Sequence, residues 1–119
     1  MMQNSLAQAQ MMLVQPSSQT INAENAAMLK QQLAETVSST EYSSLLVDMR
    51  QVESLDSEGL MVLISTLTLA QRLNKQFGLF GISPSVRIVL ELTQLDRVFE
   101  IFENLPGIEN LSGIEALAA

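Results

Sequence analysis

Two residue types are missing from this chain of 119 residues, which contains no cysteine and no histidine. Without cysteine, neither a disulfide framework nor a thiolate metal site can form. Without histidine, the chain lacks the commonest general base, the commonest metal ligand and the usual physiological-pH switch. We therefore expect no metal site, no cofactor and no enzymatic activity of the hydrolase, protease or zinc-enzyme kind.

Positive charge is scarce, because 6 Lys and Arg residues face 13 Asp and Glu residues and give a net charge of -7. An acidic surface disfavours nucleic acid and anionic lipid as partners. The longest apolar run, Leu60 to Ala70, is interrupted by hydroxyl residues and falls short of the roughly 20 residues that span a bilayer. The first charged residue is Glu24, so the N-terminus does not read as a secretory signal. We expect a cytoplasmic protein that forms a single acidic domain and is a monomer.

Segments of strand and helix character alternate along the chain, which predicts one α/β domain with a single core. Strands are expected over 11–14, 20–21, 45–49, 79–82 and 98–102, and helices over 23–37, 57–75 and 84–92. Asn22 is expected to cap the first helix, and Phe77-Gly78 to end the second. Helical spacing predicts one apolar stripe on each helix: Ala26, Leu29, Leu33 and Val37 on the first, Leu60, Leu63, Ile64, Leu67 and Leu73 on the second, and Val86, Val89, Leu90 and Leu92 on the third. The four phenylalanines are expected in the core. Residues 1–12 are interpreted as a flexible arm or weak edge strand, 13–105 as the domain, and 106–119 as a tail whose end could form a short helix.

The most informative segment is Asp56-Ser57-Glu58, which follows a buried strand and opens a strongly apolar helix. A helix N-terminus offers unpaired N–H groups and partial positive charge, so it suits a phosphate or an acidic group. One interpretation is that Asp56 or Ser57 simply caps the helix. The other is that Ser57 is a phosphorylation site, whose phosphate Asp56 and Glu58 would repel toward the surface. With no histidine and no evident base nearby, Ser57 is not expected to be a catalytic nucleophile.

Gly59 and Asp48 are two further candidates near this segment. Glycine in a helix costs about 1 kcal/mol relative to alanine, so Gly59 predicts a close approach of another backbone, or else simple tolerance near a helix end. Asp48 ends a buried strand, where a carboxylate needs a partner. A receiver-type phosphoaspartate would also need an acidic pair after the first strand, and no charged residue precedes Glu24. We therefore expect Asp48 to accept structural hydrogen bonds from loop amides.

Three blocks of sequence resemble the STAS domain, in particular the bacterial anti-sigma-factor antagonists. Ile21–Ala26 (INAENA) is similar to the family's segment that enters its first helix. Asp56–Leu60 (DSEGL), after an apolar strand ending in Asp, resembles the family's serine loop, and Ser83–Asp96 (SPSVRIVLELTQLD) its later strand-to-helix segment. Order and spacing fit from about Val14 to Phe102.

The resemblance implies a mixed β-sheet of about four to five strands packed with about four helices. In these antagonists the serine is phosphorylated by the anti-sigma factor, a GHKL-type kinase, and dephosphorylated by a PP2C-type phosphatase. The unphosphorylated form binds the anti-sigma factor and so releases sigma, which regulates transcription or stress signalling. Carried over by position, Ser57 is the phosphoacceptor. The implied partner-binding residues are Asp56, Ser57, Glu58, Gly59, Leu60, Asn22 and Ala23.

This chain departs from the family pattern at three positions near the implied docking surface. Glu58 stands where a second small hydroxyl residue is usual, Gln19 replaces a common glycine, and Asn22 replaces a common Asp. An alternative function is that of a scaffold STAS subunit of a signalling or transport complex, without phosphorylation. A nucleotide-binding or catalytic protein is a third option, but neither GxxxxGK nor GxGxxG spacing is present.

Overall fold

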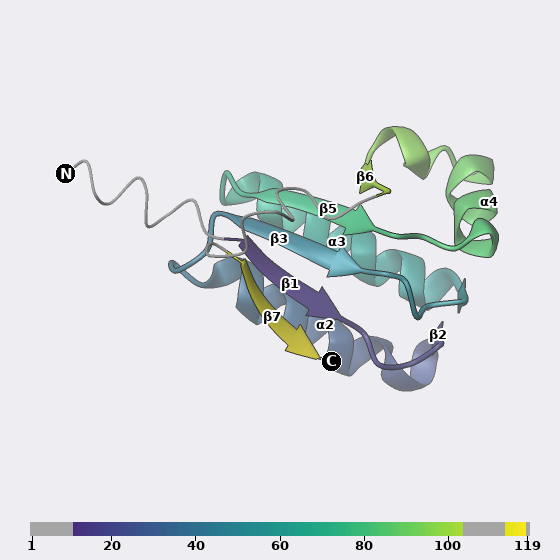
Figure 1. Cartoon of the computed structure of the whole chain (residues 1–119), viewed down its shortest axis with the longest axis horizontal. Coiled ribbons are helices and arrows are strands. Elements are labelled where there is room, and N and C mark those ends of the chain that lie inside the picture. The colour runs from purple at the N-terminus through teal and green to yellow at the C-terminus, as the bar shows by residue number, and fades with distance from the viewer. Residues whose placement is uncertain (1–10, 104–113, 119) are drawn as a thin grey trace.

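The computed structural model describes residues 11–103 and 114–118 (Figure 1). Its strands are β1 (Met11–Gln15), β2 (Thr20–Ile21), β3 (Ser44–Asp48), β4 (Ser54–Leu55), β5 (Gln76–Phe80), β6 (Glu100–Phe102) and β7 (Ile114–Ala118). Its helices are α2 (Ala23–Ser38), α3 (Ser57–Arg72), α4 (Pro84–Leu92) and a short 3₁₀ helix, η1 (Leu95–Arg97). Strands and helices alternate along the chain, which confirms the α/β class.

The main sheet has five strands in the order β6-β5-β3-β1-β7, and β2 pairs with β4 in a separate two-stranded sheet. Every pairing between these strands is parallel, so the sheet is not mixed within the part of the chain that is described. The reason is the helical crossovers: α2, α3 and α4 each return the chain to the edge at which the preceding strand began. The described residues form three α-helices, whereas the family resemblance implied about four.

The expected short helix at the C-terminus is wrong, because Ile114–Ala118 forms strand β7. β7 pairs in parallel with β1, from Met11 opposite Ile114 to Gln15 opposite Ala118. An alanine-rich segment favours a helix locally, but pairing here satisfies the backbone groups along the second edge of β1, and such tertiary context overrides propensity. Met11 and Met12, which the expected strand over 11–14 shares with the expected arm or weak edge strand, belong to β1. The remaining predicted arm and residues 104–113 lie outside the described residues, and the domain boundaries stay a prediction.

The core lies between the sheet and helices α2 and α3, which run side by side along one of its faces (Figure 1). The predicted apolar stripe of α2 is confirmed, and all of its members are buried: Ala26, Leu29, Leu33 and Val37. The stripe predicted for α3 is only partly right, because the helix ends at Arg72 and Leu73 is 42% exposed. Small residues, Thr66 and Ala70, are buried in its place and let α3 approach its neighbours closely.

Strand β5 begins earlier than predicted, at Gln76, so Phe77 and Gly78 lie inside it rather than ending the preceding helix. The phenylalanine prediction largely holds: Phe77 and Phe99 are buried edge to face with ring centroids 6.1 Å apart, and Phe102 is half-buried. These aromatic contacts fix β5 against the segment that leads into β6.

Lys75 closes the C-terminal end of α2 and gives a test of the fold. Its ammonium group donates to the carbonyl oxygens of Val37, at 2.7 Å, and Ser39. A cation at the C-terminus of a helix satisfies free carbonyls and complements the helix dipole. We expect Lys75→Met to lower the free energy of unfolding by about 1–2 kcal/mol, measured by urea denaturation. The control is Lys30→Met, at an exposed α2 lysine without a hydrogen bond to the described residues. An equal loss in both variants would contradict this role for Lys75.

Candidate docking and phosphoacceptor site

The two-stranded sheet aligns the starts of α2 and α3. Ile21 of β2 lies opposite Leu55 of β4 in a parallel register. Each strand is followed by one capping residue and then by the helix, so Asn22 and Asp56 occupy equivalent positions at the ends of the paired strands. Two helix N-termini, each with partial positive charge, therefore meet at one surface. This pairing brings the predicted site residues of the two loops together.

Both capping side chains are engaged with their own helix. Asn22 accepts from the Glu24 N–H at 2.9 Å, and Asn25 accepts from the Asn22 N–H at 3.0 Å, which completes a reciprocal capping box. Asn25 also donates to the Thr20 carbonyl at 2.8 Å, which ties α2 to β2. The cap predicted at Asn22 is confirmed.

Asp56, not Ser57, is the cap of α3. One Asp56 carboxylate oxygen accepts from the N–H groups of Glu58 at 2.9 Å and Gly59 at 3.1 Å. Ser57 is the first residue of the helix; its side chain is exposed, and none of the described residues hydrogen-bonds its hydroxyl. The capping interpretation is therefore satisfied by Asp56 alone. Ser57 is left as a free hydroxyl at a helix N-terminus.

Gly59 lies against the neighbouring strand, as one of the two interpretations of it predicted. A Cβ atom at Gly59 would lie 2.8 Å from the Ile21 carbonyl oxygen and 3.1 Å from the Ile21 Cβ. Gly59 is buried, and Leu60 is half-buried and packs against the core. These two predicted docking residues therefore pack the Ser57 turn against the protein interior, whereas Asp56 and Glu58 are exposed beside Ser57.

An ion pair anchors the start of the loop that carries Ser57. Asp48 is 1% exposed and accepts from both the Arg50 N–H at 3.0 Å and the Arg50 guanidinium at 2.8 Å. The amide bond confirms the prediction for Asp48, whereas the guanidinium was missed. The Asp48 carboxylate, by hydrogen bonding and charge, raises the pKa of Arg50 above its ordinary value. The guanidinium also lies 4.9 Å from the ring centre of Phe80, a cation–π contact.

An open groove of about 290 Å³ runs between the first halves of α2 and α3, beside the Ser57 turn. Its floor and walls are mostly small or apolar, and they include Ala23, Ala27 and Met61, which is 57% exposed. Lys30 from α2 and Glu58 from α3 give it one charge of each sign. Of the residues that line this groove, only Ala23 and Glu58 are among the docking residues expected from the sequence. Met61 was the signal in the sequence that could have predicted the groove. It is an apolar residue four positions after Ser57, so it lies on the same face of the helix.

Within residues 11–103 and 114–118, no group of three or more acidic side chains gathers in a way that could hold a metal ion. In the same part of the chain, no helix is both long and apolar enough to cross a membrane. The functional groups of the site are the Ser57 hydroxyl and the carboxylates of Asp56 and Glu58, beside the groove.

Comparisons with known proteins identify the family. The STAS domain family model matches residues 5–107, and the chain belongs to this family. It is 29% identical over 94 residues to a protein of Thermotoga neapolitana named as an anti-sigma factor antagonist, a match covering 78% of this chain and 83% of that protein. It is similar to the crystal structure of an antagonist of the same description from Thermotoga maritima, with a TM-score of 0.70, 26% identity, and coverage of 81% of this chain and 84% of that one.

The fold is also that of the Bacillus cell fate determinant SpoIIAA, solved in its phosphorylated form. The TM-score is 0.61, and the alignment covers 82% of this chain and 88% of that one. At 11% identity this likeness shows the shared fold alone.

Proposed function

We propose that this protein is a phosphorylation-switched anti-sigma-factor antagonist that acts by binding rather than by catalysis. Its unphosphorylated form binds a GHKL-type anti-sigma factor, or an equivalent switch-protein kinase, through the surface at the N-termini of α2 and α3. Phosphorylation of Ser57 releases it, and a PP2C-type phosphatase restores the binding form. The observation that carries the proposal is the free, exposed hydroxyl of Ser57 on a helix whose cap is already supplied by Asp56.

The arrangement explains how a phosphate would act. Phosphoryl transfer forms a bond between the ATP γ-phosphorus and the Ser57 oxygen, while ADP leaves and the hydroxyl proton passes to a base. One Asp56 oxygen already accepts from the Glu58 and Gly59 N–H groups, and the kinase supplies the base. Those same N–H groups are then not free to hold the phosphate, which carries about -1.5 to -2 charge at neutral pH. The new charge therefore stays at the surface, beside two carboxylates, where it opposes docking.

The direct test is phosphorylation of the intact chain. We expect incubation with ATP and the cognate GHKL-type kinase to add one phosphate, located at Ser57 by tandem mass spectrometry, and Ser57→Ala to abolish the gain. Ser85→Ala is the matched control, because Ser85 is also an exposed serine in the first turn of a helix. A stable complex with a kinase that never phosphorylates the chain would contradict the switch. It would favour the alternative, a scaffold STAS subunit of a larger assembly.

A further inference from the structure

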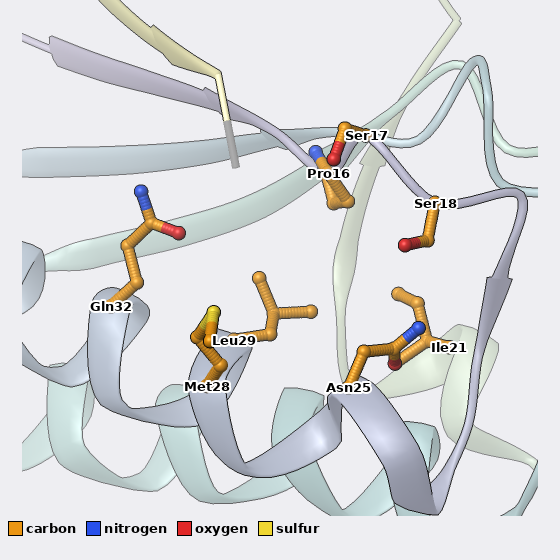
Figure 2. A pocket seen from close by; sticks show the side chains of 8 residues that line it. All are labelled: Pro16, Ser17, Ser18, Ile21, Asn25, Met28, Leu29 and Gln32. Atoms are coloured by element: carbon orange, nitrogen blue, oxygen red, sulfur yellow. The ribbon is translucent and has the colours of Figure 1, made fainter.

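We propose that a second pocket binds a small neutral molecule with an aliphatic body and an amide or hydroxyl group. It lies on the other side of α2 from the groove between α2 and α3. This pocket lies between the β1–β2 connection and the first half of α2 (Figure 2). Its volume of about 120 Å³ would hold about four water molecules at ~30 Å³ each. The phosphorylation switch does not require it.

The chemistry of its lining selects for a neutral ligand. Of the eight residues around the pocket, none is charged. The interior is formed by Pro16, Ile21 and Leu29, all buried, and Figure 2 shows the Leu29 side chain extending from α2 toward Pro16. An anion entering here would lose water without gaining a cation, and the net charge of -7 adds to that penalty.

Three polar side chains at the rim are available to a ligand. The hydroxyls of Ser17 and Ser18 and the amide of Gln32 make no hydrogen bond to any residue that the structure describes. Asn25, the other polar residue of the lining, is already committed to Thr20 and to the capping box. An apolar interior with a few unengaged polar groups at its edge is the usual composition of a small-molecule site.

The position in the fold supports the same inference. Pro16 and Ser17 directly follow β1, so the pocket lies at the carboxyl end of that strand. In open parallel α/β sheets, ligands bind in the crevice outside the carboxyl ends of the strands.

The pocket shares one wall with the Ser57 site. Ile21 lines it, and the Ile21 carbonyl accepts from the Asp56 N–H at 3.2 Å, while its side chain lies against Gly59. A molecule in the pocket thus contacts Ile21, the residue that the Ser57 turn packs against.

The test uses butyramide and butyrate, which have equal numbers of non-hydrogen atoms and differ in charge. We expect butyramide to give saturable ¹H–¹⁵N shifts in residues 16–21 and in the first half of α2, with a millimolar dissociation constant, and butyrate to give none. Gln32→Leu, which removes the amide, should weaken butyramide binding about tenfold, whereas Gln71→Leu, at an exposed glutamine of α3, should not.

Ser18→Leu, which fills the hollow from the connecting loop, is a second variant that leaves α2 untouched and should also weaken binding. The proposal is overturned if butyrate shifts the same resonances as strongly, if the butyramide shifts do not saturate, or if neither pocket variant changes the affinity. The titration needs neither a kinase nor phosphorylation, so its failure would leave the proposed switch unaffected.

Discussion

Replacing Ser57 with aspartate is expected to weaken binding to the cognate anti-sigma factor by about 100-fold or more, which corresponds to roughly 2.7 kcal/mol. The aspartate carboxylate would lie between Asp56 and Glu58 at an exposed position, and the Glu58 and Gly59 N–H groups already donate to Asp56. Closing a partner over that surface would desolvate an unpaired charge, and such charges cost several kcal/mol. Isothermal titration calorimetry with the kinase in the presence of ADP measures the effect.

Two variants separate charge from shape in this experiment. Ser57→Ala keeps the surface neutral and should bind within a few-fold of the unmodified chain. Ser85→Asp places the same carboxylate in the first turn of α4 and should also leave the affinity nearly unchanged, because Ser85 is exposed on another helix. Tight binding by Ser57→Asp would show that charge at this position does not control release.

The parts of the site that the sequence predicted are local ones. Asn22 and Asp56 are capping residue types placed just before apolar-periodic runs, and the α2 stripe repeats with helical spacing, so both were readable without knowledge of the fold. The same reasoning put Ser57 in the first turn of a helix, where α3 begins; its role as a phosphoacceptor stays a prediction. α4 shows the limit of that reasoning: Val86 and Leu90 are buried as predicted, but Leu92 is 80% exposed because the helix ends there.

The parts that the sequence did not predict depend on contacts between distant segments. The β2–β4 pairing involves only two residues in each strand, too few for a periodic signal, yet it brings Asn22 beside Asp56. Arg50 is only two residues from Asp48, but its guanidinium also lies over the ring of Phe80, which belongs to another strand. β7 pairs with β1 from the opposite end of the chain, against the helical propensity of its alanines. Each of these contacts joins segments that are far apart in the sequence, so a local sequence pattern cannot predict it.

Gly59 connects the local and the distant features, and substituting it should affect both stability and the site. Alanine normally favours a helix over glycine by about 1 kcal/mol. At Gly59 its Cβ would lie 2.8 Å from the Ile21 carbonyl oxygen, a backbone atom that cannot rotate away. Overpacking of this kind costs about 1–3 kcal/mol, so the clash should outweigh the gain in helix propensity.

We therefore expect Gly59→Ala to lower the free energy of unfolding by about 1–2 kcal/mol and Gly59→Val by about 3 kcal/mol, measured by urea denaturation. Glu58→Ala, at the exposed neighbouring position, places an alanine in the same turn without the clash and should change stability by less than about 1 kcal/mol. The Ile21 carbonyl also accepts from the Asp56 N–H at 3.2 Å, so displacing it should shift the Asp56 and Ser57 amide resonances in folded Gly59→Ala. A stabilised Gly59→Ala would show instead that β2 yields at no cost, and that the close approach does not position the Ser57 turn.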